Sequence, residues 1–153
     1  MPLLKIGDVF GIETSNGIAY FQYVHKNEDI GSLIRILPNL YKDNNKDVLN
    51  ELVEQKELYL IHFPLDAAFA RKIVSKMGNY PMPKDFVLPK KFRVDHIIKG
   101  EFICWYIVDY TNWHRERVDK LNDYQKRLSP WGTWNDTLLK ERLAEGWTLD
   151  YWS

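Results

Sequence analysis

The sequence predicts an α+β protein. We expect a strongly twisted, mostly antiparallel sheet, open or rolled into a partial barrel, with two or three helices packed against it. Three observations predict this class. Residues 5–24 are typical of two short strands joined at Asn16-Gly17, with a third strand close behind, and a second strand pair surrounds Lys99-Gly100. Between and after these pairs, apolar residues recur with the spacing of helices.

The chain length of 153 residues indicates a single domain spanning 1–153. A chain of this size buries roughly 70% of the surface that its unfolded form exposes, so it needs no disulfide or metal ion to stabilise its core. Cys104 is the one cysteine, so it cannot form an internal disulfide, and its apolar surroundings favour a buried thiol. No signal-like or bilayer-length apolar stretch is present, so we expect a soluble, cytoplasmic protein in a reducing compartment.

The first two strands are expected over residues 9–15 and 18–25. Asn16-Gly17 suits the two positive-φ positions of a type I′ turn, and the register that follows places Ile12 opposite Phe21.

Two further strands are expected before the midpoint of the chain. Residues 33–37 form the first, and the strand period of two leaves two alternatives for its core face: Ser32, Ile34 and Ile36, or Leu33 and Leu37. Residues 58–63 form the second, with one face made by Tyr59, Ile61 and Phe63.

Three segments have helical periodicity. The first carries an apolar face made by Val48, Leu49, Leu52 and Val53, which places three carboxylates on the opposite face: Asp47, Glu51 and Glu54. The second is expected to begin at the N-cap Asp66, to end at Gly78, and to carry Phe69, Ala70, Ile73, Val74 and Met77. The third is expected to begin at the N-cap Asp136, to end at Gly146, and to carry Leu138, Leu139 and Leu143.

A second hairpin is expected from residues 92–98 and 101–110. The latter strand is apolar on both alternating faces, which predicts a central strand covered on both sides. Residues 113–117 resemble a charged connection. All six tryptophans lie in the last third of the chain. Most are expected to be in the core or partly buried against the sheet, because a small domain uses large aromatics to close its core.

The charge balance argues against a dedicated nucleic-acid binder. The chain carries 21 basic and 21 acidic side chains, whereas phosphate recognition normally requires a basic excess. The distribution is uneven, with eight basic and three acidic residues in 66–99. A basic cluster in this part is expected to be a solvated loop: Lys84, Lys90, Lys91 and Arg93.

The sequence contains no catalytic or metal-binding motif. None of the four histidines has a second His or Cys at metal-ligand spacing, and no nucleophile elbow or phosphate loop is present. Asp95 and His96 would point to opposite faces of a strand and could not act together. We therefore predict no enzymatic activity, no metal and no cofactor.

The N-terminal hairpin resembles a known family. In the family classed as bacterial immunity protein 26, found beside polymorphic toxins, a Lys-x-Gly-Asp-Val-Phe segment is followed by a Gly-x-Ala-Tyr strand. The matching residues are Lys5, Gly7, Asp8, Val9, Phe10, Gly17, Ala19 and Tyr20. The resemblance covers about 20 residues, and Phe21 stands where the family often has glycine. It implies a protein that binds and neutralises a cognate toxin by steric and electrostatic occlusion, and it implies no catalytic residues.

Two sets of residues are candidate partner contacts. Asp47, Glu51 and Glu54 form a carboxylate stripe suited to a basic partner, and Trp131 and Trp134 offer aromatic surface. Two other classes of function stay open: a small-molecule or nucleic-acid binding module that uses an aromatic surface, and a hydrolase built from scattered Asp, Glu and His. A toxin gene beside the gene for this chain would separate the first class from both others.

Overall fold

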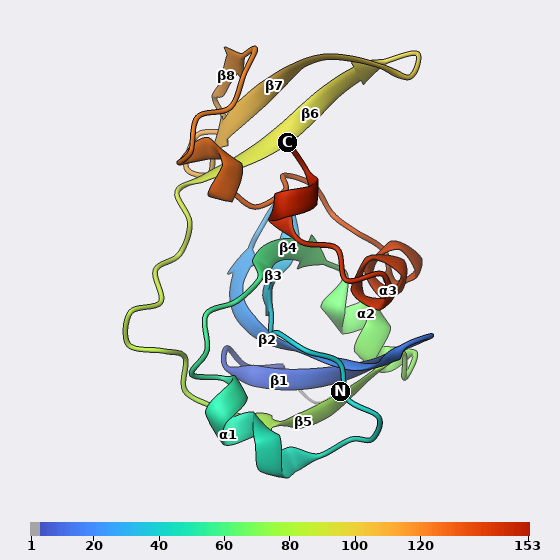
Figure 1. Ribbon diagram of the computed structural model, residues 1–153. Coiled ribbons are helices and arrows are strands. Elements are labelled where there is room, and N and C mark those ends of the chain that lie inside the picture. Colours follow the sequence, from blue (N-terminus) through green and yellow to red (C-terminus); the bar gives the residue numbers. More distant parts are fainter. Residues whose placement is uncertain (1–3) are drawn as a thin grey trace.

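Two antiparallel sheets and three short α-helices make up the fold (Figure 1). The computed structural model describes residues 4–153. The predicted α+β class is confirmed. The strands form two sheets, of five and three strands, and the described part of the chain forms no closed barrel.

The larger sheet has the strand order β4-β3-β2-β1-β5. Its strands are β1 (Asp8–Thr14), β2 (Gly17–Asn27), β3 (Gly31–Ile36), β4 (Tyr59–Phe63) and β5 (Val74–Asn79). All neighbours pair antiparallel, so the first three strands form the expected meander. β4 forms one edge of the sheet and β5 the other.

The turn between β1 and β2 differs from the prediction. Thr14 pairs with Gly17, so the two loop residues are Ser15 and Asn16. Only Gly17 has a positive φ, of 135°, which rules out the type I′ turn predicted for Asn16-Gly17. Gly17 occupies the last position of the turn, where glycine is favoured in type I turns.

The register of this hairpin is displaced by two residues from the predicted one. Ile12 lies opposite Ala19, and Phe21 lies opposite Phe10. Because side chains alternate faces with a period of two, a shift of two residues keeps every side chain on its predicted face. The predicted pairing was therefore wrong, although Ile12 and Phe21 do lie on the same face of the sheet.

Both faces of the five-stranded sheet are buried. On one face, the aromatic and aliphatic residues of all five strands pack under the helices α2 (Leu65–Ala70) and α3 (Asp136–Ala144) (Figure 1). The other face packs at one end under α1 (Leu49–Leu52) and at the other end against the smaller sheet. This explains why β3 buries both of its alternative core sets.

The second predicted helix is wrong in its C-terminal half. α2 ends at Ala70, Lys72 has a φ of 62°, and Val74 and Met77 belong to β5. Pairing with β1 therefore overrides the helical spacing of these apolar residues. Asp66 lies within the first turn of α2 and is not its N-cap.

The first predicted helix is shorter than expected, and the third begins one residue earlier than expected. A 3₁₀ turn, η1 (Lys46–Val48), precedes the single turn of α1. α3 is capped by Asn135, one residue before the predicted cap Asp136, since the Asn135 side chain accepts from the amide of Leu138 at 2.8 Å. Gly146, with a φ of 71°, follows α3 as expected.

The smaller sheet consists of β6 (Lys91–Ile98), β7 (Glu101–Asp109) and β8 (Arg115–Val118), in that order. The predicted hairpin of β6 and β7 is confirmed. β8 occupies the segment expected to be a charged connection. β7 is central, but only its C-terminal half is covered on both sides: Cys104, Trp105, Ile107 and Val108 are buried, whereas Phe102 and Ile103 are exposed.

Residues 129–134 join the two sheets. This segment lies beside β4 of the larger sheet and β6 of the smaller one, with a parallel bridge to each. Four hydrogen bonds connect it to both edges: Arg93 N to Ser129 O (3.0 Å), Trp131 N to Arg93 O (2.8 Å), Leu60 N to Ser129 Oγ (2.9 Å) and Trp134 N to His62 O (3.0 Å).

Arg35 is fully buried between α1 and the larger sheet. Its Nε donates to Gln22 Oε1 at 2.7 Å, and its Nη1 donates to the carbonyl of Gln55 at 3.0 Å. Its Nη2 donates to the carbonyl of Val53, and Glu57 lies 3.5 Å away as an ion-pair partner. Arg35, which belongs to β3, therefore holds the segment after α1 in place through hydrogen bonds and an ion pair.

Arg93 has the same role in the smaller sheet, where a solvated position was predicted wrongly. Its guanidinium is fully buried and donates to four backbone carbonyls, those of Lys126, Leu128, Leu149 and Trp152. It also lies over the rings of Trp105 and Trp152, at 5.1 and 4.4 Å from their centroids. Burial lowers the pKa of Arg93 to about 10, so the group stays charged at neutral pH.

Candidate functional site

The residues of the N-terminal motif have structural roles. The carboxylate of Asp8 is buried and accepts from the amide of Lys5 (2.8 Å) and from Asn79 Nδ2 (3.0 Å), and it pairs with Lys76 at 3.2 Å. Burial acts to raise the pKa of Asp8, but these three partners hold it below the usual value. Gly7 has a φ of 99°, and a Cβ there would lie 2.8 Å from the carbonyl oxygen of Tyr80. The motif fixes the start of β1 against β5 and presents no reactive group.

The acidic stripe, defined by Asp47, Glu51 and Glu54, is exposed as predicted. The opposite side of this segment is buried against the sheet through Leu49, Leu52 and Val53. None of the three carboxylates has a described lysine, arginine or histidine nitrogen within 4.0 Å. The stripe is therefore not neutralised by ion pairs among residues 4–153.

The backbone under the stripe is held at both ends. Asn45 caps η1 by accepting from the amide of Asp47 at 2.9 Å, and Arg35 binds the carbonyls that follow α1. Glu54 and Asp85 border one pocket of about 250 Å³, which Glu57 and Lys56 also line. The arrangement presents fixed negative charge to an approaching partner.

Trp131 and Trp134 are both partly buried and do not share a surface with the acidic stripe. Trp131 packs between the sheets, 5.6 Å from the ring of Phe92. Trp134 packs on the α3 side of the larger sheet, against Tyr59 and Trp147. α1 covers the opposite face of that sheet. Trp105 is buried and most of the other tryptophans are partly buried, as predicted, while Trp113 is the most exposed, at 42%.

The histidines of the described chain belong to no metal-binding cluster. Across residues 4–153, no group of three or more His, Cys, Asp or Glu side chains could hold a metal ion. His62 is fully buried, and its Nε2 lies 2.7 Å from the Tyr110 hydroxyl, while its Nδ1 has no hydrogen-bond partner within the described chain. Burial lowers its pKa to about 4, and the nearby His25 adds to the shift, so the ring is neutral at pH 7.

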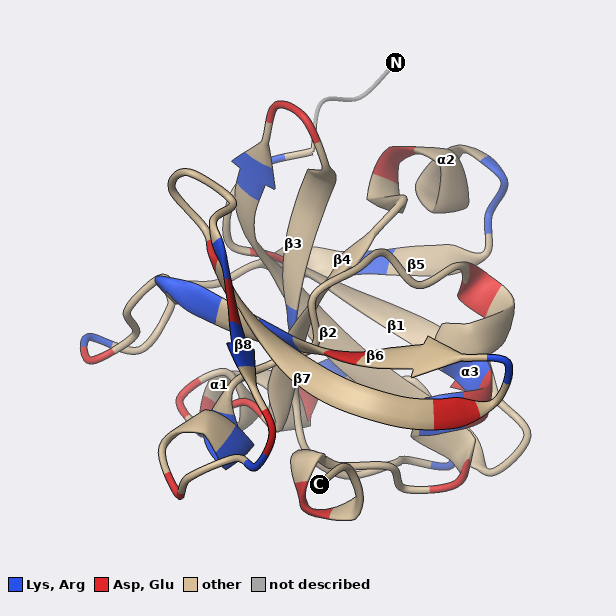
Figure 2. Cartoon of the chain, turned by 90° about the horizontal axis from the view of Figure 1, so that it is seen from above, with Lys and Arg blue, Asp and Glu red and all other residues tan. Residues whose placement is uncertain are grey.

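An exposed apolar surface at the end of the β6–β7 hairpin was not predicted. Its four side chains, named here the hairpin-tip patch, are Ile97 (52% exposed), Ile98 (49%), Phe102 (49%) and Ile103 (39%). The hairpin extends away from the rest of the molecule (Figure 1). Lys99 and Glu101 are the charged residues at its end, and the strands behind them carry little charge (Figure 2).

A β-bulge shapes this patch. His96 pairs with Cys104 and Ile97 with Phe102, so Ile103 is an extra residue in β7. Phe102 consequently packs against Trp105, with ring centroids 5.6 Å apart. The sequence did carry a signal for the patch, since both strands are apolar on consecutive positions up to Lys99-Gly100. That signal was interpreted as a strand covered on both sides, because sequence alone does not show where the covering elements end.

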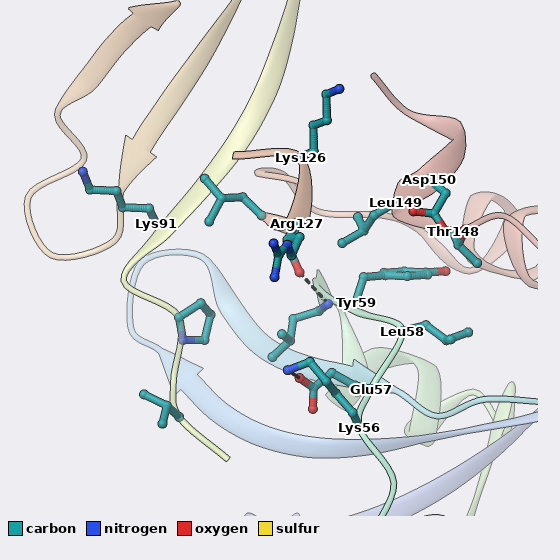
Figure 3. Close-up of a pocket in the computed structure, with 15 residues that line it drawn as sticks. Lys56, Glu57, Leu58, Tyr59, Lys91, Lys126, Arg127, Thr148, Leu149 and Asp150 are labelled. Carbon is teal, nitrogen blue, oxygen red and sulfur yellow. Dashed lines mark hydrogen bonds and ion pairs between the residues drawn. The ribbon is translucent and has the colours of Figure 1, made fainter. Parts of the chain in front are cut away.

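A pocket of about 440 Å³ lies between the two sheets (Figure 3). We name it the inter-sheet pocket. Four segments line it: residues 56–60 at β4, 87–91 at the start of β6, 126–129 around η2 (Gln125–Arg127), and 148–150 at η3 (Leu149–Tyr151). Its rim is mostly basic, which the sequence did not indicate, since these segments are distant in the chain.

No protein-family model, curated protein or solved structure matches this chain. In addition, no helix of residues 4–153 combines the length and apolar character needed to span a bilayer.

Proposed function

We propose that this chain is a cytoplasmic immunity protein that binds a cognate bacterial toxin domain and neutralises it by occlusion, without turnover. The resemblance of the N-terminal hairpin to immunity protein 26 supports the class. The arrangement of the described side chains agrees with a binding role, because the buried His62–Tyr110 pair and the motif residue Asp8 are both enclosed by their own partners. The single cysteine is buried and free, which suits a reducing compartment.

The hairpin-tip patch is the single observation that carries the proposal. Large apolar side chains exposed together are typical of protein interaction sites, and here they occupy both faces of the hairpin end, because Ile97 and Ile98 are consecutive in β6. Here they belong to an ordered hairpin, so little conformational entropy is lost when a partner covers them. Phe102 is the best candidate for an anchor residue, because large aromatic side chains supply much of the binding energy at interface centres. The contact would place the hairpin in a concave site of the toxin.

The acidic stripe is the second candidate contact. Many toxins of this kind are nucleases with basic substrate clefts, and a carboxylate stripe can occupy such a cleft. Complementary charge mainly accelerates association. Asp47 lies in η1, Glu51 in α1 and Glu54 just after α1, and all three are exposed, which suits this role.

The test is protection of cells that co-express the toxin domain encoded beside this chain. One variant carries Ile98→Lys and Phe102→Lys, and a second carries Asp47→Lys, Glu51→Lys and Glu54→Lys. A matched control reverses three other exposed, unpaired carboxylates: Glu28, Glu116 and Asp123. We expect loss of protection and of toxin binding in the hairpin variant, with an unchanged circular dichroism spectrum.

The second variant distinguishes the two contacts. If the stripe makes the contact, the triple lysine variant should bind the toxin more slowly and should no longer protect cells. The rate of its association should also depend less on salt concentration. If both variants fold and protect like the wild type, the interface lies elsewhere, and the surface around Trp131 and Trp134 is the next candidate. The proposed function itself is wrong if the wild type neutralises no toxin from its own gene neighbourhood.

A further inference from the structure

We propose that the inter-sheet pocket binds a small molecule that combines an apolar body with an anionic phosphate or carboxylate group. This site is separate from the two candidate protein contacts, and the proposal does not depend on the proposed function.

The volume of the pocket suits a small ligand. Ligand sites commonly enclose about 300–1,000 Å³, and the inter-sheet pocket has about 440 Å³. It lies where segments from both sheets and both C-terminal 3₁₀ turns meet (Figure 3). Such junctions between structural units are common places for ligand sites.

The rim of the pocket carries an excess of positive charge in a chain whose net charge is zero. Lys91, Lys126 and Arg127 are exposed at the pocket, and no described carboxylate lies within 4.0 Å of their charged nitrogens. Lys56 also lines the pocket and is paired with Glu57 at 3.8 Å. The acidic lining residues are Glu57 and Asp150, so four cations against two carboxylates leave the lining with a positive excess. The ends of Lys91 and Lys126 extend outward from the pocket (Figure 3), so this excess lies around its mouth, where it attracts anions.

A fifth cation lies behind one wall of the pocket. The buried guanidinium of Arg93 donates to the carbonyls of Lys126, Leu128 and Leu149, which are all lining residues. No described carboxylate lies within 4.0 Å of it, so its charge is not cancelled by an ion pair. Arg93 therefore adds positive potential and fixes the backbone that carries Lys126 and Arg127.

The opposite wall is fixed by the other buried arginine. Arg35 pairs with Glu57 at 3.5 Å and binds the carbonyl of Gln55, just before the lining segment begins at Lys56. Both walls are thus held before a ligand arrives. Such preorganisation reduces the entropy lost on binding.

The buried part of the pocket lining is largely apolar, and Ser129 contributes a hydroxyl to it. Leu60 and Leu128 are buried at the pocket, and Val87 is 73% exposed at its rim. The Oγ of Ser129 accepts from the amide of Leu60 at 2.9 Å, so its own hydrogen is available for an acceptor in the pocket. Apolar contacts would hold the body of the ligand, while the rim cations would hold its anionic group.

The test uses four simple probes and the amide NMR spectrum of the whole chain. Phenyl phosphate and phenylacetate carry the same ring with different anions, benzyl alcohol carries the ring without charge, and inorganic phosphate carries charge without a ring. We expect saturable shifts at residues 56–60 and 126–129 with phenyl phosphate, phenylacetate or both. Benzyl alcohol and inorganic phosphate should each bind at least about tenfold more weakly. The stronger of the two anionic probes identifies the group that the site prefers.

A pair of charge-reversal variants completes the test. Lys126→Glu with Arg127→Glu should weaken probe binding by about tenfold or more, while the control Lys99→Glu with Lys120→Glu, also exposed, should leave it unchanged. The proposal is overturned if neither anionic probe gives saturable shifts at millimolar concentration. It is equally overturned if benzyl alcohol binds as well as the anions, or if the pocket variant binds like the wild type while its spectrum remains that of the native fold.

Discussion

The two sheets are built from similar strands but are covered to different extents. In the larger sheet, helices cover one face, while α1 and the smaller sheet cover the other. In the smaller sheet, only the half near the rest of the molecule is buried, and the far half exposes four large apolar side chains. Apolar strand residues that are buried under other elements stabilise the fold. The uncovered ones have no such explanation within the described chain, which makes them the best candidates for contact with a partner.

The edges of the sheets show the same difference. Residues 129–134 occupy the edges of β4 and of β6 near Arg93. β8, the outer strand on the other side, is short and carries three charges in the sequence Arg115–Val118, a common protection against edge-to-edge association. The far half of β6 combines an edge position with the exposed Ile97 and Ile98. Natural proteins rarely leave such an edge unprotected without a use for it.

The largest expected effect compares the two buried arginines. Arg35→Met should lower the free energy of unfolding by about 3–5 kcal/mol, because it leaves Glu57, Gln22 and the Val53 carbonyl without their cationic donor. Arg93→Met should cost less, about 2–3 kcal/mol, because three of its four carbonyl partners are only partly buried and can accept from water. Urea unfolding followed by tryptophan fluorescence measures both values.

The exposed Arg117, which pairs with Asp119 at 3.3 Å, is the matched control. Arg117→Met should leave the free energy of unfolding unchanged within the error of the measurement, because an exposed ion pair contributes little to stability. A larger loss for Arg93→Met than for Arg35→Met would contradict the view that the larger sheet is the more completely enclosed region.

The next effect concerns the boundary between the two sheets, where His62 packs against Phe92, Tyr110 and Trp131. Burial lowers its folded-state pKa to about 4 from the ordinary 6.5, so folding favours the neutral ring. The stability from this group is therefore complete above pH 6.5 and is lost as the pH falls from 6.5 towards 4. The pKa difference corresponds to about 3 kcal/mol.

Titrating carboxylates also change stability in this range, so His62→Gln serves as the reference. Glutamine keeps a polar group beside the Tyr110 hydroxyl but does not titrate. Between pH 7 and pH 4, the wild type should lose about 3 kcal/mol more than this variant in urea unfolding. Equal losses in the two proteins would show that His62 does not carry the acid sensitivity.

Local patterns in the sequence predicted the parts of the fold that depend on near neighbours. The meander, the β6–β7 hairpin, the exposed side of Asp47, Glu51 and Glu54, and the buried Cys104 all follow from periodicity and turn residues. Local signals failed at the first turn, where Thr14 pairs with Gly17, and the larger failure came from long-range pairing. Val74 and Met77 have helical spacing but pair with β1, and no local pattern indicates that a strand will be available there.

The candidate sites show the same limit. The acidic stripe is a local pattern and was found, whereas the inter-sheet pocket joins segments up to roughly 90 residues apart and was not. Arg93 belongs to a basic cluster in the sequence, which suggested solvent exposure. It is buried because the carbonyls of Lys126, Leu128 and Leu149, all distant in sequence, converge on its guanidinium.

The smallest expected effect separates the turns of the two hairpins. At the β6–β7 turn, Lys99 and Gly100 have φ values of 52° and 81°, the type I′ combination that was predicted for the other hairpin. A Cβ on Gly100 would meet nothing within 4 Å, so Gly100→Ala carries only the left-handed backbone cost of about 1 kcal/mol, and Gly100→Asn less. Gly17 has a φ of 135°, and its Cβ would lie 2.9 Å from the Tyr41 carbonyl oxygen.

Gly17→Ala and Gly17→Val should therefore each lower the free energy of unfolding by about 2 kcal/mol, and Gly17→Asn should give no relief, because φ near 135° is accessible to glycine and hardly to asparagine. Thermal and urea unfolding of the matched alanine pair measure the difference. The Tyr41 carbonyl accepts from the amide of Ile18 at 2.6 Å, so the backbone cannot simply move away from a new Cβ. A Gly17→Val protein as stable as the wild type would refute this turn geometry, and it would remove the physical reason for glycine at one matching position of the N-terminal motif.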